Sequence, residues 1–278
     1  MHILITGAQG QLGHDVVAEC LCRGWQTTGV DRQDFDLTDH IATQAFLARA
    51  NPDVIIHCAA YTAVNKAESE PEQAFAVNEI GTRNIAEYCA AQGIWLIYVS
   101  TDYVFDGSGK KPWEVSDSPA PLNVYGKSKL AGEQVAQALC NKHMIVRTSW
   151  VFGPHGNNFV KTMLRLGAER ESMNVVSDQT GSPTYTVDLA RLLCAMAARP
   201  VAGIYHAANA GECTWAEFAA KIFALAKLEC KVNAIPSSDY PTAAKRPLNS
   251  RLSPKSLLDA GYVPLPPWEF ALAQMLNA

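Results

Sequence analysis

The sequence predicts an α/β fold, a doubly wound parallel sheet with a smaller C-terminal lobe. Three observations lead to this prediction. Over residues 1–150, short apolar runs alternate with longer segments of helical periodicity, as buried parallel strands and their crossover helices do. After Trp150 the alternation becomes less regular, and no linker-like stretch divides the chain. The chain has 278 residues, 48% of them hydrophobic, which is enough for one large core with an attached lobe.

The first half of the chain contains five expected strands. The first, HILIT at 2–6, is continuously apolar, and the helix that follows ends at Gly24. The other strands are expected at 25–31, 53–60, 94–100 and 143–149. Further helices are expected at 42–51, where Pro52 ends the helix, and at 72–93 and 124–139. This order implies right-handed crossovers between parallel strands.

The second half mixes both kinds of element. Helices are expected at 157–170, 186–198 and 214–228, strands at 173–178 and 203–209, and a proline-rich tail at 235–254. We therefore predict a dinucleotide-binding domain over residues 1–150, with a returning segment at about 173–202. Residues 151–278 would supply the substrate-binding lobe.

Composition narrows the class of partner. The net charge of -4 argues against nucleic acid or an acidic membrane surface as a general partner. None of the eight cysteines forms a C-x-x-C pair, which is typical of a reducing, cytoplasmic protein. The N-terminus lacks a basic segment before an apolar one, so no secretory signal is expected. No apolar run approaches the roughly 18 residues of a membrane-spanning helix.

A glycine triplet lies where the first expected strand meets its helix. Gly7, Gly10 and Gly13 in TGAQGQLG are spaced three and three. A helix N-terminus offers free N–H groups and a partial positive charge, and glycines let a pyrophosphate approach the backbone. A triplet alone is a weak signal, because a turn without a ligand can also be rich in glycine. In this strand-to-helix context it predicts dinucleotide binding.

Two adjacent charged residues bear on the choice of cofactor. Asp31 ends the second expected strand, where an acid can bond a ribose hydroxyl and so favours NAD. Arg32 follows directly and could hold the 2′-phosphate of NADP, or could be an ordinary solvated residue. The two signals conflict, and we expect NADPH to be used, with NADH as the alternative.

Several motifs in sequence order resemble the extended short-chain dehydrogenase/reductase family. They are TGAQGQLG, CAAYTAV, YVSTDYVFDG and YGKSK. The stretches STDYVFDG, NNFVKTM, SDQTGSPTYTVDLA and RPLNSRL are more specific and resemble the dTDP-4-dehydrorhamnose reductase branch of that family. The resemblance covers nearly the whole chain. It implies reduction of the 4-keto group of a dTDP-linked 6-deoxy sugar by a nicotinamide, giving dTDP-L-rhamnose.

The resemblance also assigns catalytic roles. Tyr125 would be the proton donor, Lys129 its activator, and Thr101 the hydroxyl that polarises the carbonyl. A tyrosine and a lysine four residues apart occur on many helices, but here they follow the fourth expected strand. Because hydride addition leaves an alkoxide, a proton donor is required. A nearby cation is expected to lower the tyrosine pKa from about 10 by about 1 to 3 units.

Further site residues are carried over by motif. Gly10, Gln11 and Leu12 would contact the pyrophosphate, with Gly7 and Gly13 shaping the turn. The remaining cofactor contacts would be Asp31, Arg32, Asp36, Leu37, Ala60, Tyr61, Thr62 and Val99, with Tyr125 and Lys129. The substrate would contact Thr101, Asp102, Trp150, Asn158 and Arg246. Asn157 and Asn249 are further candidates, although a core role for Trp150 and loop roles for the asparagines and Arg246 are alternatives.

Metal binding and assembly depend on acidic residues that the chain mostly lacks. Some family members hold Mg²⁺ with acids at a dimer interface. The first of these positions falls at Asp15, shorter than the usual Glu, the second falls near Val187 and Asp188, and the third has only Glu269 nearby. We therefore expect no metal and a monomer.

Two other functions remain open at this level. One is a nucleotide-sugar epimerase or 4,6-dehydratase of the same extended family. A dehydratase carries Glu after the Thr-Asp pair, whereas this chain has Tyr103 there and lacks the base. The other is a non-catalytic nucleotide-binding protein, similar to the regulatory subunit of methionine adenosyltransferase. The intact set of Thr101, Tyr125 and Lys129 argues against it.

Overall fold

A six-stranded parallel sheet forms the centre of the computed structural model, which describes residues 1–277. Its order is β10-β5-β4-β3-β1-β2, and every neighbouring pair is parallel. The strands are β1 (His2–Thr6), β2 (Gln26–Val30), β3 (Val54–His57), β4 (Trp95–Thr101), β5 (His143–Thr148) and β10 (Gly203–His206). All five residues of β1 are buried, as expected for a strand covered on both faces.

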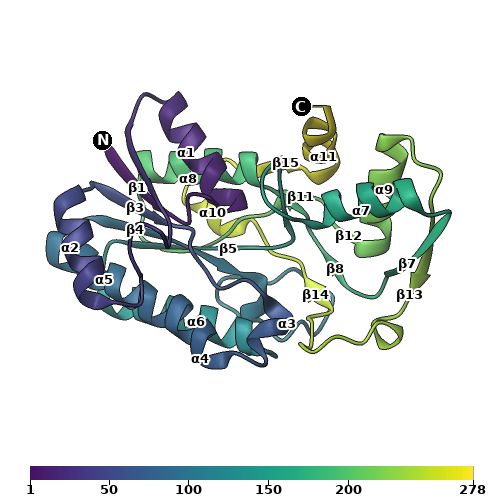
Figure 1. Ribbon diagram of the computed structural model, residues 1–278, viewed down its shortest axis with the longest axis horizontal. Coiled ribbons are helices and arrows are strands. Elements are labelled where there is room, and N and C mark those ends of the chain that lie inside the picture. Colours follow the sequence, from purple (N-terminus) through teal and green to yellow (C-terminus); the bar gives the residue numbers. More distant parts are fainter. Residues whose placement is uncertain (278) are drawn as a thin grey trace.

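Helices cover both faces of this sheet (Figure 1). One face carries α1 (Gln11–Cys22), α8 (Thr186–Ala198) and α10 (Lys255–Asp259), and the other carries α2 (His40–Ala50), α5 (Gly81–Gln92) and α6 (Val124–Leu139). Each face has its own apolar core: Val16 and Leu189 belong to the first, and Leu47 and Ile85 to the second. The predicted doubly wound parallel sheet is confirmed.

The long helix expected at 72–93 contains an irregular turn. It divides into α4 (Pro71–Phe75), a π-helical turn η1 (Ala76–Ile80) and α5. Single π turns inside helices often occur at functional sites. Here the turn carries Asn78, whose side chain accepts a hydrogen bond from Tyr61 N at 2.8 Å and donates to Ser128 Oγ at 2.9 Å. Asn78 therefore ties the loop after β3 to helix α6.

The C-terminal lobe has a separate core. Helices α7 (Phe159–Glu169), α9 (Trp215–Ala226) and α11 (Trp268–Asn277) surround an apolar cluster that includes Phe218 and Ile222. Strand β7 (Ser172–Val176) pairs in parallel with β13 (Lys231–Ile235). The short elements are α3 (Val64–Ala67), η2 (Asp102–Val104), β6 (Val151–Phe152), β8 (Thr180–Gly181), β9 (Thr184–Tyr185), β11 (Asn209–Ala210), β12 (Cys213–Thr214), η3 (Ser237–Asp239), β14 (Asn249–Ser250) and β15 (Leu265–Pro267).

The chain crosses between sheet and lobe at places other than those expected. The predicted returning segment at about 173–202 begins with β7, which pairs inside the lobe. It also stops short of β10, which adds the sixth strand beside β5. Helix α8 lies against α1, and α10 returns later to pack beside β10. Strand pairing between distant segments decides these boundaries, and local sequence patterns do not reveal it.

The sheet order reverses between β1 and β3, because the crossover after β1 passes over one face with α1 and the crossover after β3 passes over the other face with α5. Loops following the two strands therefore separate and leave a crevice at their carboxyl ends, the usual ligand position in open α/β sheets. Within residues 1–277, no helix is both long and apolar enough to cross a membrane.

Candidate active site

A cavity of about 1070 Å³ opens at the carboxyl ends of β1, β3 and β4 and extends toward the lobe. It is larger than the pockets of about 300–1,000 Å³ that hold single small ligands. Nineteen of the residues predicted for the site line it: Gly7, Gly10, Gln11, Leu12, Gly13, Asp31, Arg32, Asp36, Leu37, Ala60, Tyr61, Thr62, Val99, Thr101, Asp102, Tyr125, Lys129, Trp150 and Arg246.

One end of the cavity consists of backbone at the start of α1. Gly7 has a φ of +68°, and a Cβ there would lie 2.7 Å from Ala59 N. A Cβ on Gly13 would lie 2.0 Å from Gly7 O, so only glycine lets the helix pack on the turn. Gly10 is the N-cap residue and provides no side-chain cap, which leaves N–H groups of the first turn for a ligand. This end suits a pyrophosphate.

The edge of the cavity near β2 carries the two charged residues Asp31 and Arg32. Asp31 Oδ2 accepts a hydrogen bond from Gln9 N at 3.2 Å, and its Oδ1 accepts one from Arg32 N at 2.8 Å. The Asp31 carboxylate therefore already links the turn after β1 to the start of the loop after β2. Arg32 is exposed, so its guanidinium is the more available group for a ligand phosphate.

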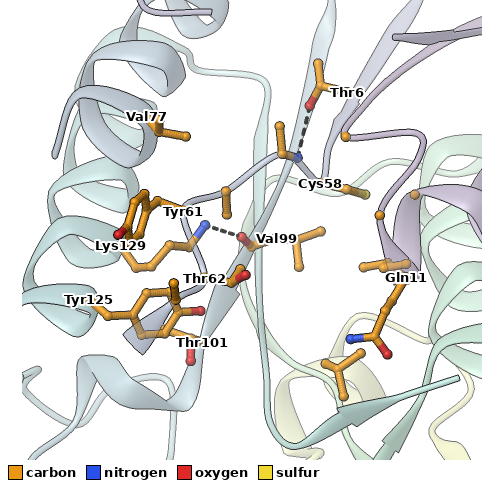
Figure 2. A pocket seen from close by; sticks show the side chains of 18 of the residues that line it. Thr6, Gln11, Cys58, Tyr61, Thr62, Val77, Val99, Thr101, Tyr125 and Lys129 are labelled. Carbon is orange, nitrogen blue, oxygen red and sulfur yellow. Dashed lines mark hydrogen bonds between the residues drawn. The ribbon is translucent and has the colours of Figure 1, made fainter. Parts of the chain in front are cut away.

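The opposite end carries the predicted catalytic side chains (Figure 2). Thr101 is the last residue of β4 and is buried. Tyr125 and Lys129 lie on α6, whose first turn is capped by Asn123 accepting a hydrogen bond from Gly126 N at 2.8 Å. The Lys129 ammonium donates to Val99 O at 2.7 Å and lies 4.0 Å from the centre of the Tyr98 ring. The end of β4 and one face of α6 therefore bring Thr101, Tyr125 and Lys129 to the same end of the cavity.

Burial sets the protonation of these groups. It raises the pKa of the Tyr125 phenol above its ordinary value, and the nearby Thr101 hydroxyl opposes this only in part. The net lowering of the Tyr125 pKa expected from Lys129 is not found, because desolvation outweighs it and the ammonium donates to the Val99 carbonyl. Burial also lowers the pKa of Lys129 to about 7, while the Glu133 carboxylate acts in the opposite direction.

A buried ion pair lies behind the catalytic end. Arg147 on β5 makes two bonds to Glu133 on α6, from Nη2 to Oε2 at 2.6 Å and from Nε to Oε1 at 2.9 Å. Ser100, the residue before Thr101, donates to the same carboxylate at 2.5 Å. Both charged side chains are at most 2% exposed. The pair joins β4, β5 and α6, the elements that carry Thr101, Tyr125 and Lys129.

Two buried polar atoms of the cavity wall lack partners among the described residues. They are Asp102 Oδ2 and Arg246 Nε. Burial raises the pKa of Asp102 to about 7, despite hydrogen bonds from Ser250 and Thr101 that lower it. Unpaired buried polar groups are costly, so a carboxyl and a guanidinium facing one cavity indicate a polar ligand between or beside them.

Comparison with known proteins assigns the family. Residues 1–278 match the family described as RmlD substrate binding domain. The chain belongs to this family. The dTDP-4-dehydrorhamnose reductase of Escherichia coli (strain K12) is 41% identical over 292 residues, covering 100% of this chain and 97% of that protein. The dTDP-4-keto-6-deoxy-D-glucose reductase of Streptomyces niveus is 40% identical, covering 99% and 97%.

A solved member of the family has nearly the same fold. The crystal structure of the dTDP-4-dehydrorhamnose reductase from Bacillus anthracis in complex with NADP superposes with a TM-score of 0.97. It is 42% identical and covers 99% of this chain and 98% of that one. The resemblance inferred from the motifs is thereby confirmed.

One predicted substrate residue does not line the cavity of this family member. Asn158 is the N-cap of α7, where its Oδ1 accepts from Lys161 N at 3.0 Å. Its amide donates to Gly153 O at 2.8 Å and to Gln11 Oε1 at 3.0 Å. The side chain therefore positions Gln11 and the loop, and the neighbouring Asn157 lines the cavity instead. Asn249, the other asparagine candidate, bonds Lys111 O at 2.8 Å.

Sequence reasoning also missed residues of the cavity wall. Trp215, the first residue of α9, stacks on Trp150 with ring centroids 3.7 Å apart and planes 13° from parallel. Trp150 has a φ of +48°, uncommon for a non-glycine residue, and this directs its ring onto Trp215. The pair closes the lobe side of the cavity. A tryptophan directly after the cap Thr214 was the available signal, but sequence reasoning placed it only within the helix expected at 214–228.

Proposed function

We propose that the chain reduces the 4-keto group of dTDP-4-dehydro-L-rhamnose to dTDP-L-rhamnose, with NADPH as the hydride donor. The observation that carries the proposal is the placement of Thr101, Tyr125 and Lys129 in the same cavity as a glycine-lined helix N-terminus. Relatives that match the chain over its full length and carry the name dTDP-4-dehydrorhamnose reductase support the same reaction.

The cofactor would lie between the two ends of the cavity. Its pyrophosphate fits the N–H groups of Gln11 and Leu12, where Gly10 leaves the helix uncapped. Its ribose and adenine would contact Asp31, Arg32, Asp36 and Leu37 at the rim. Its nicotinamide end would lie beside Val99 and Lys129, with Ala60, Tyr61 and Thr62 lining the approach.

The chain's own residues handle the proton and the charge. Bound NADPH would transfer a hydride from a nicotinamide C–H bond to C4 and become NADP⁺, and the electron pair of the C=O π bond would pass to the oxygen. Tyr125 donates its phenolic proton to that oxygen, and the Thr101 hydroxyl donates a hydrogen bond to it. Because burial keeps the Tyr125 pKa high, the phenol is protonated at neutral pH and ready to act as an acid. The ammonium of Lys129 stabilises the resulting phenolate until water reprotonates it.

The sugar and its nucleotide would contact the lobe side. Asp102 and Arg246 offer the unpartnered atoms for polar sugar or diphosphate groups, and Trp150 offers an aromatic face. Dehydration is disfavoured at the position where a dehydratase has its base. Tyr103 is there, and burial raises the pKa of its phenol to about 12. It therefore does not accept a proton readily near neutral pH.

A direct assay tests the proposal. The protein is mixed with NADPH and dTDP-4-dehydro-L-rhamnose, and nicotinamide absorbance and product identity are followed. The expected result is one dTDP-L-rhamnose formed per NADPH consumed. A parallel assay uses dTDP-4-keto-6-deoxy-D-glucose, the sugar in the name of the Streptomyces niveus relative. Binding of both ligands without turnover would contradict the proposal and favour a non-catalytic role.

Assembly and location form part of the same proposal. The acid expected at the second Mg²⁺ position is engaged, since Asp188 accepts from Asn209 Nδ2 at 2.9 Å and lies 3.5 Å from the Arg191 guanidinium. This supports a monomer of 30.2 kDa whose activity needs no Mg²⁺. The eight free cysteines support a reducing cytoplasm. Light scattering with and without EDTA tests assembly, and dissociation of a dimer on chelation would contradict it.

A further inference from the structure

Two histidines and an aspartate meet outside the cavity, where the lobe touches helix α1. His14 and Asp15 lie on the first part of α1, and His155 lies in the loop between β6 and α7. A ligand nitrogen of each histidine and a carboxylate oxygen of Asp15 all lie within 4.8 Å of one another. Asp15 Oδ1 is 3.9 Å from His14 Nδ1 and 3.8 Å from His155 Nε2. The two imidazole rings stack with centroids 3.5 Å apart.

The buried carboxylate of Asp15 lacks a hydrogen-bond partner on one of its oxygens within the described part of the chain. The residue is only 7% exposed, yet its Oδ2 accepts no hydrogen bond from any residue between 1 and 277. A buried carboxylate without a partner is costly, and the nearby Arg191 is paired with Asp188. At distances near 4 Å, the imidazoles do not satisfy the carboxylate by direct hydrogen bonds. A cation placed among the three side chains would do so.

We propose that His14, Asp15 and His155 bind a divalent transition metal ion, with Zn²⁺ as the natural occupant. Zn²⁺ binds nitrogen and carboxylate oxygen at about 2.0–2.2 Å, and sites with three protein ligands leave a fourth position for water. The two histidine side chains are 50% and 41% exposed, so both rings are free to rotate toward a bound ion. Imidazole ligands select Zn²⁺, Ni²⁺ or Cu²⁺ over Mg²⁺.

This site differs from the magnesium site considered from the sequence. That expectation concerned carboxylates from two chains, whereas the three ligands here come from one chain and two of them are nitrogens. Only Asp15 is common to both sets. Metal binding at this site would therefore not join two chains, and the mass of the protein in solution would not double.

The position of the site predicts that a bound metal affects cofactor exchange, and this part of the inference rests on the proposed function. The loop that carries His155 also carries Gly156 and leads to Asn158, and Asn158 bonds Gln11 at 3.0 Å. A Cβ on Gly156 would lie 2.7 Å from the Gln11 side chain, so this loop presses on the helix start that faces the cofactor. A metal joining His155 to α1 would fasten the loop there and slow cofactor exchange.

Metal binding is tested directly, without reference to turnover. Co²⁺ absorption and calorimetric titration with Zn²⁺ are measured on the full chain, on His14→Ala and on His155→Ala. His40→Ala serves as a control, because this exposed histidine lies elsewhere, 3.3 Å from Glu87. We expect one Zn²⁺ per chain in the unaltered protein and the control, and affinity more than about tenfold weaker in both site variants.

The outcomes separate clearly. Unaltered Zn²⁺ affinity in His155→Ala, displacement of Co²⁺ by equimolar Mg²⁺, or doubling of the mass on metal binding would each overturn the site. The circular dichroism spectra of His14→Ala and His155→Ala should match that of the unaltered chain, which shows that both variants fold. The effect of the metal on cofactor exchange is tested by following NADPH release by fluorescence. Release should be slower with Zn²⁺ in the unaltered chain and unchanged by Zn²⁺ in His155→Ala. Equal release rates with and without Zn²⁺ would overturn the fastening role, while the binding data still decide the site.

Discussion

The two ends of the cavity are built by different physical means. The end proposed for the cofactor phosphates is backbone: Gly7 and Gly13 permit close approach, and N–H groups of α1 provide the positive potential. The end proposed for catalysis depends on side chains whose charges are buried, with Lys129 held at Val99 O and the ion pair of Glu133 and Arg147 behind it. Ligand binding at the first end should therefore depend mainly on backbone shape, and catalysis at the second end on buried charges and on the position of a proton. Substitutions should expose this difference.

The largest effect is expected where a single proton is removed. Tyr125→Phe keeps the ring but deletes the phenolic hydrogen, so turnover should fall by about 10² to 10⁴-fold. NADPH affinity should remain near that of the unaltered chain, because the phosphate end is untouched. Tyr103→Phe is the matched control, since its ring lies 5.6 Å from that of Tyr125 and it has no proposed proton role. Wild-type turnover in Tyr125→Phe would remove the proposed donor.

The next effect concerns the buried charge behind the site. Glu133→Gln leaves the Arg147 guanidinium buried without a counter-charge, which should lower the free energy of unfolding by about 3 kcal/mol in urea titrations. The double variant Glu133→Gln/Arg147→Met should recover part of that loss. If Glu133→Gln is as stable as the unaltered chain, the ion pair does not hold these elements together.

The same variant has a pH consequence. Burial lowers the pKa of Lys129 to about 7, and the Glu133 carboxylate is what raises it toward its ordinary value. Without that carboxylate the Lys129 pKa should fall further, so the ammonium is lost at lower pH. The alkaline limb of the kcat/KM profile that depends on the ammonium should shift to lower pH in Glu133→Gln. An unchanged limb would show that Glu133 acts only through stability.

At the phosphate end the expected effect is steric. In Gly13→Ala the new Cβ would meet Gly7 O at 2.0 Å, so the helix start must move from the turn, at a cost of about 1–3 kcal/mol. NADPH affinity should fall, measured by fluorescence titration, and kcat at saturating NADPH should change little. Gly24→Ala is the control, because nothing lies within 4 Å of a Cβ there, although its positive φ carries a backbone strain of its own. Equal NADPH affinity in Gly13→Ala and the unaltered chain would contradict the proposed phosphate site.

The two ends also differ in what the sequence could predict. The glycine spacing, the strand that precedes it and the Tyr125–Lys129 interval are local patterns, and the structure brings all of them to one cavity. The support behind them was not predictable, because Glu133 and Arg147 meet only when α6 packs on β5. Trp215 reaches the cavity through the lobe, and Asn158 is directed away from it by its capping role. The sixth strand was recognised as a strand, but its place in the large sheet depends on pairing with β5.

The smallest effect is expected at the exposed rim, where Arg32 is proposed to meet the 2′-phosphate of NADPH. The Asp31 carboxylate already accepts two backbone N–H groups, so Arg32 is the freer of the two side chains. Because the contact is exposed to solvent, Arg32→Ala should weaken NADPH binding by only about 1 kcal/mol, roughly fivefold. NADH affinity should change much less, since NADH carries no 2′-phosphate. The neighbouring exposed Gln33→Ala should leave the ratio of the two affinities unchanged. An equal loss for both cofactors would show that Arg32 contacts something that NADH and NADPH share.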